Sequence, residues 1–486
     1  MDARDPTRAA IRPYREARVE QIYSGADRAA LRTAGLADAA VADWLAATPD
    51  GTGAFAEDCR RYGVFWRLAD ALIAQLPPKA ARMPAQATAA AAVFRKARET
   101  RERFLRQHAE AVYAAVTHDF SRFVRIEELV LAAADTIPGL APTRQQIAAE
   151  VDTIQRDKDG LEIDQGILLA HVLGHERAGR HLCHAMLLAH PGTAEHLARF
   201  AASGAIDLGP VRLERRGRVA HLTTHNPRYL NAEDGTTLEA MEIAVDLATL
   251  DPATDIAVMR GDTVEHPKYR GRHVFGSGIN LTHLYRGKIP FVWYLQRDLG
   301  FVHKLLRGVA SPDVLPDDVE GAGTEKPWIA AVDSFAIGGH CQLLLTMDYV
   351  LAAHDAFMTL PARKEGIIPG AANLRLPRFT GDRLARQLIQ YERRLVCDSA
   401  EGLLICDVIA PAAEMDAAID RVAAGLTNSG AVSAVGNRRA FRVVQEPLDV
   451  FRRYFAVYAR EQALCHFSPA LIANLERYWD AQNRKG

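Results

Sequence analysis

The sequence predicts an α/β fold, in which short buried strands alternate with helices, preceded by a long all-helical region. Two observations support this prediction. Residues 1–205 carry alanine, leucine, glutamate and arginine at helical spacing, with few stretches of strand character. Beyond residue 210, short apolar runs alternate with helical patterns, the order typical of strands that are joined through helices.

Glycine and proline divide the N-terminal region into separate helices. The breaks fall at Asp50–Gly53, Pro77–Pro78 and Pro138–Gly139. The first ~25 residues are expected to form a mobile tail, because termini that are not tied down by packing usually move. A basic cluster at residues 95–103 is interleaved with glutamates, which favours a solvated helix face over a nucleic-acid site.

Five histidines of this region raise the question of a metal site. They are His171, His175, His181, His184 and His190. The first two lie one helical turn apart, as metal ligands on a helix would. No His-Glu-x-x-His motif accompanies them, so we favour structural or surface histidines and expect no metal.

Four apolar runs in the second half of the chain read as buried strands. They are Val219–Thr223, Ile256–Arg260, Trp328–Val332 and Tyr349–Ala353. Between and before them the pattern predicts a linker at residues 202–210, a hairpin turn at 215–218 and a helix at 236–250.

The chain is expected to become helical again from Asp382 onward. It ends in an aromatic, arginine-rich helix pattern, Phe451–Arg460, which either docks on a partner subunit or packs on its own domain. Length alone predicts two or three domains. We place a helical N-terminal domain at residues 1–205, an α/β core at 206–425 and a C-terminal helical oligomerisation segment at 426–486.

Composition limits the possible partners and compartments. Basic and acidic residues nearly balance, 59 against 60, which favours neither nucleic acid nor an anionic membrane as the main partner. No uncharged run reaches ~18 residues, and residues 1–6 lack the apolar core of a signal peptide. Six scattered cysteines without a Cys-x-x-Cys pair fit a reduced cytoplasm, where we expect the protein to act.

One stretch of the core has a backbone feature that is suited to catalysis. The strand Trp328–Val332 leads to the paired glycines Gly338 and Gly339, and a helix pattern follows at Cys341–Met347. A strand that ends at glycines and continues as a helix leaves backbone N–H groups free at the helix N-terminus. Such groups can stabilise a developing negative charge.

This stretch contains two of five sequence motifs that follow one another along the chain. They are Asn226-Pro-Arg-Tyr-Leu-Asn-Ala232, Phe275-Gly-Ser-Gly-Ile-Asn-Leu281, Lys326-Pro-Trp-Ile-Ala-Ala-Val332, Ile337-Gly-Gly-His-Cys-Gln342 and Gly366-Ile-Ile-Pro-Gly370. From about Val211 to the C-terminus, this series resembles the crotonase (enoyl-CoA hydratase/isomerase) superfamily. The resemblance implies a spiral core of ββα turns, an acyl-CoA thioester as substrate, and assembly as a homotrimer or a dimer of trimers.

The resemblance also implies an oxyanion hole made of two backbone N–H groups, those of Ile279 and Gly339. A thioester carbonyl gains negative charge when its α-carbon is deprotonated, and two preorganised donors stabilise the enolate. Glycine at position 339 allows the backbone to approach a ligand closely.

Two departures from the family pattern narrow the chemistry. Hydratases of the family carry glutamates where this chain has Gln342 and Ala362. Glutamine and alanine transfer no proton, so the addition of water is disfavoured. The residues that remain around the expected pocket are apolar: Ile279, Leu281, Ala362 and Ile367.

These departures, with the helical N-terminal region, resemble a cofactor-independent dioxygenase branch of the superfamily. That resemblance implies the conversion of 3,5-dihydroxyphenylacetyl-CoA and O2 to 3,5-dihydroxyphenylglyoxylate and CoA without metal or flavin, in the route to the dihydroxyphenylglycine of vancomycin-type antibiotics. It further implies that Glu233, Arg297 and Gln342 hold polar groups of the substrate. A plain ion pair between Glu233 and Arg297 is an equal alternative.

Other assignments stay open at this stage. Arg228, Arg286 and Lys288 are candidates for the CoA phosphates. The base that takes the α-proton is not identified, because Asp333, Asp348 and Glu365 stand out of register with the family positions. A crotonase-like thioesterase and a catalytically silent acyl-CoA-binding scaffold are the alternative functions.

Overall fold

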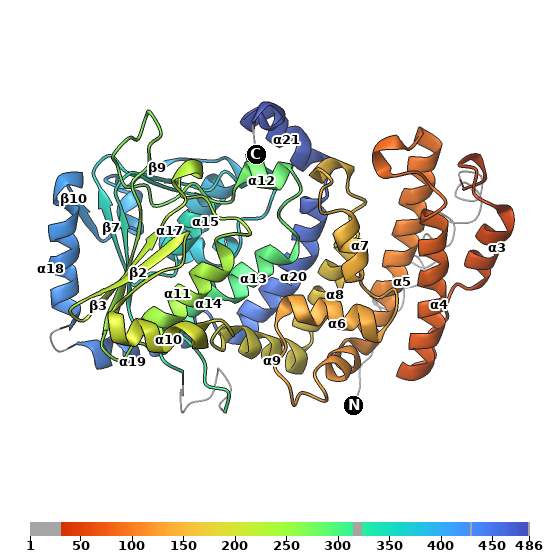
Figure 1. Cartoon of the computed structure of the whole chain (residues 1–486), viewed down its shortest axis with the longest axis horizontal. Helices are drawn as coiled ribbons and strands as arrows, with labels where there is room; N and C mark the ends of the chain where they lie inside the picture. Colours follow the sequence, from red (N-terminus) through yellow and green to blue (C-terminus); the bar gives the residue numbers. More distant parts are fainter. Residues whose placement is uncertain (1–30, 314–322, 428–429, 485–486) are drawn as a thin grey trace.

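A seven-stranded sheet occupies one end of the molecule, and helices fill the middle and the other end (Figure 1). The computed structural model describes residues 31–313, 323–427 and 430–484. The expected mobile tail at the N-terminus lies outside the described residues. The α/β fold class is confirmed by the alternation of strands and helices beyond residue 204.

The large sheet has the strand order β1-β2-β3-β4-β5-β7-β10. Its strands are β1 (Ala205–Asp207), β2 (Val211–Arg216), β3 (Val219–Thr224), β4 (Ile256–Gly261), β5 (Trp328–Val332), β7 (Tyr349–Ala353) and β10 (Val408–Ala410). The first three run antiparallel, and β3 to β10 run parallel. All four predicted strands are confirmed, as is the hairpin turn between β2 and β3.

Two sequence predictions about the strands are wrong. The expected linker at residues 202–210 contains β1, whose Ile206 pairs with Leu213 and is buried. The region beyond Asp382 contains β9 (Leu395–Val396) and β10 as well as helices. Strands of two or three residues are too short to show a period of two, so sheet pairing rather than local pattern defines them.

A second, three-stranded sheet carries the central stretch of the core. Its order is β6-β8-β9, with β6 at Phe335–Ile337 and β8 at Phe357–Thr359. An isolated bridge between Gly276 and Ala336 ties the loop before Ile279 to this sheet. Two segments about sixty residues apart in sequence are therefore held side by side.

The helical N-terminal region is confirmed over the part that the structure describes. Its α-helices are α3 (Asp38–Ala46), α4 (Phe55–Ile73), α5 (Pro84–Val116), α6 (Ile126–Thr136), α7 (Arg144–Ala149), α8 (Ile163–Gly174), α9 (Glu176–Leu187) and α10 (Thr193–Ser203). The three predicted breaks fall between α3 and α4, between α4 and α5, and after α6.

The five histidines of this region contact protein groups. His171 lies 2.8 Å from a Glu102 oxygen, and His181 lies 2.9 Å from the Tyr113 hydroxyl. His184 stacks on Phe123. No group of three or more histidine, cysteine or acidic side chains is arranged for a metal within the described ranges.

Further α-helices belong to the core and to the C-terminal region. They are α11 (Leu238–Leu250), α12 (Leu281–Tyr285), α13 (Val292–Leu299), α14 (Phe301–Arg307), α15 (Gly339–Leu344), α16 (Ala362–Glu365), α17 (Ala372–Gln390), α18 (Met415–Thr427), α19 (Ala431–Gln445), α20 (Leu448–His466) and α21 (Pro469–Trp479). None of the described helices is long and apolar enough to cross a membrane.

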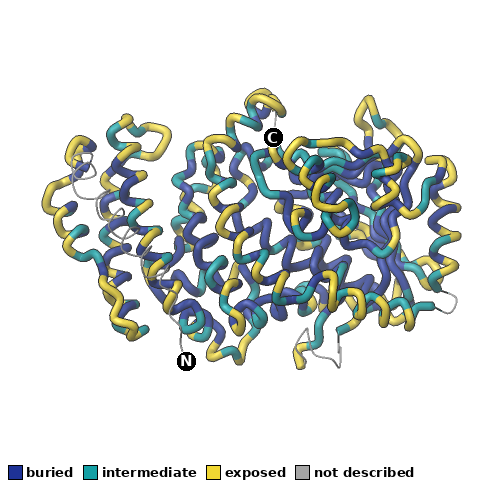
Figure 2. Tube along the Cα trace, turned by 180° about the vertical axis from the view of Figure 1, so that it is seen from behind, coloured by how far each residue is buried: buried dark blue, intermediate teal, exposed yellow. Residues whose placement is uncertain are grey.

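The aromatic C-terminal helix packs on its own chain. Phe451 and Phe455 of α20 are fully buried in one hydrophobic core with residues of α8 such as Leu169. The same core includes Phe291, which precedes α13. Figure 2 shows buried segments running through the helices in the middle of the molecule. Because this core joins all three predicted domains, the proposed domain boundaries stay a prediction.

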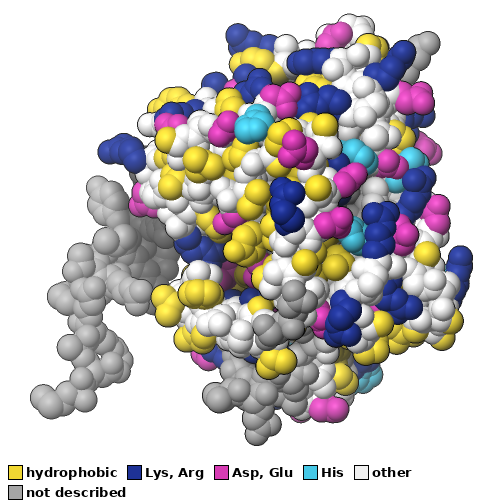
Figure 3. Space-filling view, turned by 90° about the vertical axis from the view of Figure 1, so that its left-hand side faces the viewer, with side chains coloured by type: hydrophobic (Ala, Val, Ile, Leu, Met, Phe, Trp, Pro, Cys, Tyr) yellow, Lys and Arg dark blue, Asp and Glu magenta, His cyan; other side chains and the backbone are white. Residues whose placement is uncertain are grey.

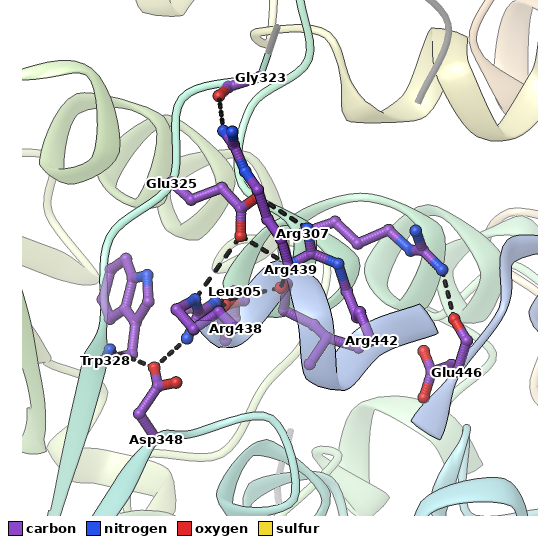
Figure 4. Close-up of polar contacts among 11 residues, drawn as sticks. Leu305, Arg307, Gly323, Glu325, Trp328, Asp348, Arg438, Arg439, Arg442 and Glu446 are labelled. Atoms are coloured by element: carbon purple, nitrogen blue, oxygen red, sulfur yellow. Dashed lines mark hydrogen bonds and ion pairs between the residues drawn. The ribbon is translucent and has the colours of Figure 1, made fainter. Parts of the chain in front are cut away.

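Arginines attach α19 to the core in spite of its exposed surface. Arg439 and Arg442 bind the buried carboxylate of Glu325 at 2.8 and 2.6 Å, and Arg438 binds Asp348 (Figure 4). The face of the molecule that carries α18 intersperses basic and acidic side chains, without a large patch of one sign (Figure 3).

Candidate active site

The site is built on the turn that joins β6 to α15. Gly338 adopts a positive φ of 55°, and its N–H donates to the Thr359 carbonyl at 2.9 Å. Gly339 follows as the first residue of α15, where no preceding helical carbonyl accepts from its N–H. Within the described part of the chain, the Gly339 N–H donates no hydrogen bond.

A second glycine-rich loop meets this turn. Gly278 has a φ of 82°, and a β-carbon added there would lie 3.2 Å from the Gly339 nitrogen. The N–H of the next residue, Ile279, also makes no hydrogen bond to any described residue. The structure thus brings together the two backbone donors that the sequence predicts, and both are free.

Glu233 is fixed beside the second loop by main-chain bonds. Its N–H donates to the Gly278 carbonyl at 2.8 Å, and its carbonyl accepts from the Asn280 N–H at 2.8 Å. This short parallel bridge pairs Glu233 with Ile279. The Glu233 carboxylate therefore lies close to the predicted oxyanion hole.

Arg297 of α13 joins the predicted polar residues in one network. Its guanidinium donates to Glu233 Oε1 at 2.9 Å, to Gln342 Oε1 at 3.1 Å and to the Gly339 carbonyl at 2.9 Å. Arg297 is 2% exposed, so the Glu233–Arg297 contact is a buried ion pair and not a surface pair. A role in binding substrate stays a prediction, because a structural ion pair would share this geometry.

Burial and charge oppose each other in this network. Burial disfavours the charged guanidinium, but Glu233 and Asp298 outweigh it and raise the pKa of Arg297. Burial raises the pKa of Asp298 to about 6, although Arg297 and Arg375 act in the opposite direction. A cation thus persists in the network even where one of its carboxyls is protonated.

Close packing makes glycine necessary at position 339. A β-carbon there would lie 2.4 Å from Glu233 Oε2 and 3.1 Å from Arg297 Nη2. Distances below 3.0 Å force atoms to move. The glycine therefore lets the ion pair approach the helix N-terminus that carries the free donor.

Sequence reasoning missed His340, which supports the second loop. Its Nδ1 accepts from the Gly278 N–H at 3.1 Å, and its ring fills the space over Gly276. Burial lowers the pKa of His340 to about 4, so the ring is neutral and available as an acceptor. A histidine after Gly-Gly in the sequence gives no sign of this contact, which depends on a loop sixty residues away.

The four apolar residues predicted around the substrate are only partly grouped. Ile279, Leu281 and Ile367 belong to or pack against the same hydrophobic core. Ala362 lies outside that core and is buried in α16, and its carbonyl accepts from the Ile367 N–H at 3.2 Å. An O2-binding role for these residues stays a prediction.

The three predicted CoA-binding cations differ in their surroundings. Arg228 and Lys288 are exposed, and the charges of both act on His283 of α12. Arg286 donates to the Arg484 carbonyl at 3.0 Å and so contacts the C-terminal segment. Arg228 and Lys288 thus share one neighbourhood, while Arg286, two residues before Lys288, also contacts the C-terminal segment.

Comparison with known proteins places this site in a family. The model of the enoyl-CoA hydratase/isomerase family matches residues 316–446. The chain is 48% identical over 407 residues to the (3,5-dihydroxyphenyl)acetyl-CoA 1,2-dioxygenase of Amycolatopsis orientalis, covering 84% of this chain and 92% of that protein. It is 25% identical to the carnitinyl-CoA dehydratase of Escherichia coli K12, over 54% and 90% of the two chains.

Solved structures of the same family are also similar. An enoyl-CoA hydratase/isomerase from Xanthobacter autotrophicus Py2 matches 56% of this chain and 95% of its own, at 22% identity and a TM-score of 0.45. An enoyl-CoA hydratase from Mycobacterium avium subsp. paratuberculosis matches 58% and 99%, at 20% identity and a TM-score of 0.44.

The chain belongs to the crotonase, or enoyl-CoA hydratase/isomerase, family. Within that family, the extensive identity to the Amycolatopsis dioxygenase covers far more of the chain than the identity to the dehydratase.

Proposed function

We propose that this protein is a cofactor- and metal-independent dioxygenase that converts 3,5-dihydroxyphenylacetyl-CoA and O2 to 3,5-dihydroxyphenylglyoxylate and CoA. The observation that carries the proposal is the pair of free N–H groups at Ile279 and Gly339, beside a buried arginine network. The similarity to the Amycolatopsis enzyme supports this substrate.

The reaction begins at the thioester. Its carbonyl oxygen accepts from the Ile279 and Gly339 N–H groups, and loss of an α-proton leaves an enolate that these donors stabilise. The aryl ring shares the charge, so the α-carbon is electron-rich enough to reduce O2 directly. A carbon–oxygen bond forms and gives a peroxide anion on the α-carbon.

The peroxide then displaces CoA and is converted to the product. Its terminal oxygen attacks the thioester carbonyl, the carbon–sulfur bond breaks, and CoA leaves as thiolate. Cleavage of the oxygen–oxygen bond with loss of the second α-proton gives the α-keto acid. Both new oxygen atoms come from O2, and O2 is the only oxidant required.

The polar network and the surface cations bind the substrate in this proposal. Arg297, Glu233 and Gln342 hold the polar groups of the substrate, and Arg297, which stays charged even when buried, stabilises negative charge on them. Arg228 and Lys288 bind the CoA phosphates from one exposed neighbourhood, and Arg286 has a secondary role there.

The same proposal includes assembly and compartment. We place the protein in the cytoplasm, where its six cysteines would stay reduced. We propose a homotrimer or a dimer of trimers in which α19 contacts a neighbouring subunit. The exposed apolar side chains of α19, Val432, Phe441, Val443 and Val444, support this contact.

An oxygen-electrode assay separates the proposal from its alternatives. Metal-stripped protein receives 3,5-dihydroxyphenylacetyl-CoA, and O2 uptake, free CoA and glyoxylate are measured together. The dioxygenase consumes one O2 for each CoA that it releases. Release of CoA without O2 uptake indicates a thioesterase, and binding without turnover indicates a silent scaffold. Activity that requires added iron contradicts the cofactor-free mechanism.

A further inference from the structure

A buried carboxylate that the mechanism above does not use stands next to the oxyanion hole. Glu365 ends α16 and is 8% exposed. A β-carbon added at Gly338 would lie 3.6 Å from Glu365 Oε1 and 3.5 Å from the Gly278 Cα. The carboxylate therefore faces the point where the two donor-bearing loops meet.

Glu365 shares a helix face with Ala362. Residues three apart on a helix are neighbours on its surface, and α16 begins at Ala362 and ends at Glu365. The family resemblance places a hydratase glutamate at position 362, where this chain has alanine. This chain thus keeps a carboxylate near that place, displaced by one helical turn.

The carboxylate is left without a partner although cations flank it in sequence. Arg363 and Lys364 both bind Glu392, at 3.1 and 2.7 Å. The Glu365 side chain makes no hydrogen bond or ion pair with any residue that the structure describes. An unpaired buried carboxylate costs stability, so its presence calls for a function.

We propose that Glu365 is the base that removes the α-proton from the acyl-CoA bound in the oxyanion hole. This inference rests on the proposed function and supplies its missing residue. The α-carbon–hydrogen bond breaks, the proton moves to a Glu365 oxygen, and the electron pair enters the thioester enolate. The same carboxylate, after returning its proton to the departing CoA thiolate, can accept the second α-proton.

The surroundings of Glu365 suit a base that works near neutral pH. Burial first, and the charge of Glu392 second, raise the pKa of Glu365 to about 7. The other titratable group known to interact with it is Tyr294 of α13, whose own pKa burial raises. From α21, the neutral side chain of Asn474 donates to the Arg363 carbonyl at 3.1 Å. General acid–base catalysis is most efficient when the pKa lies near the working pH.

The test is solvent exchange of the α-protons without oxygen. Full-length protein and 3,5-dihydroxyphenylacetyl-CoA are mixed anaerobically in D2O, and deuterium incorporation is followed by NMR. The E365Q variant is expected to lose exchange by about 100-fold or more, the range typical of a lost general base. Substrate affinity is expected to change less than about threefold, because the donors and Arg297 remain. Exchange in E365Q within threefold of wild type overturns the proposal.

Two further measurements guard against a misfolded variant. The rate of wild-type exchange should rise with pH through about 7, because only the ionised base accepts a proton. The E365D variant should show the same rise. E392Q removes the adjacent charge, so it should retain exchange, and the rise of the exchange rate should occur at a lower pH. The proposal is contradicted if the rise occurs at the same pH in E392Q as in wild type and is also still present in E365Q. Since exchange needs no O2, wild-type exchange without O2 uptake would refute only the dioxygenase.

Discussion

Single residues fix how the site acts, and Gly339 is the clearest case. Its N–H makes no hydrogen bond to any described residue, and a β-carbon added there would lie 2.4 Å from Glu233 Oε2 and 3.1 Å from Arg297 Nη2. A β-carbon at this position would therefore displace both the Gly339 N–H and the ion pair.

Gly339→Ala is expected to lower kcat/KM by about 100-fold or more, the cost of losing one oxyanion donor. The added methyl would sit 2.4 Å from Glu233 Oε2, so the donor must move. Gly425→Ala in α18 is the matched control, because a β-carbon there meets nothing within 4 Å. Steady-state kinetics with both variants test this, and equal activity would contradict the oxyanion assignment.

Ala362→Glu tests whether the apolar surroundings serve O2. A carboxylate at this buried position should reduce oxygenation more than thioester binding, because a charged group excludes an apolar gas from its surroundings. O2 uptake and the affinity for a non-hydrolysable acyl-CoA analogue are compared. If both fall equally, position 362 has no specific role in O2 binding.

The residues that sequence reasoning found and missed differ in a physical way. Ile279, Gly339 and Gln342 lie in short motifs whose order in the chain is informative. His340 and Asp298 matter through contacts with Gly278 and Gly370, which lie sixty or more residues away. Glu365 stands out of register with the family positions, and the sequence does not reveal that Arg363 and Lys364 pair with Glu392.

At the scale of elements, polar contacts hold α19, which has no buried residue. Glu325 is the centre of this attachment, since three arginines of the helix lie within 3.6 Å of its carboxylate. Burial opposes the charge, but Arg442 and Arg439 lower the pKa of Glu325. The attachment is therefore complete at neutral pH and is lost as acid protonates Glu325.

Glu325→Gln should release α19 while the sheet stays intact. One partner of a buried charge cluster is removed, a change that typically costs about 3–5 kcal/mol. Hydrogen exchange should increase at residues 431–445 and remain slow in β4 and β5. Glu401→Gln, which breaks the exposed pair with Arg393, is the control and should leave exchange at α19 unchanged.

Elements also show where prediction from sequence succeeds. The strands β4, β5 and β7 appear at the predicted residues, because runs of four or five consecutive buried apolar residues leave few alternatives. In contrast, β1 and β10 gain their structure from pairing with β2 and β7. Such short edge strands depend on the completed sheet rather than on their own composition.

At the scale of the whole molecule, close packing of α8 on α20 joins the first and last helical regions. Gly166 permits it, because a β-carbon there would lie 2.5 Å from the Ala463 β-carbon and 2.8 Å from the Ala459 carbonyl oxygen. The opposite helix carries Gln462, whose side chain accepts from the Ile368 N–H at 2.8 Å. Interhelical packing is thus connected to the segment that bears Ile367 and Glu365.

Gly166→Ala is expected to cost about 1–3 kcal/mol of stability, typical of an overpacked core. Activity should fall as well, because α20 must move away from Ile368. Gly174→Ala on the same helix is the control, since its β-carbon would meet Ala456 at an ordinary 4.0 Å. Thermal unfolding and turnover are measured for both. Equal melting temperatures would show that the α8–α20 contact is not tight in solution.

This contact between α8 and α20 has a consequence for synthesis of the protein. Arg452 of α20 donates to the Leu173 carbonyl, 279 residues earlier in the chain. On the ribosome, α8 therefore emerges long before α20, the helix that completes its core. The apolar face of α8 stays exposed until α20 has been synthesised. The helical region can reach its final packing only after most of the polypeptide has been translated, so chaperone binding to the nascent chain would protect this face in particular.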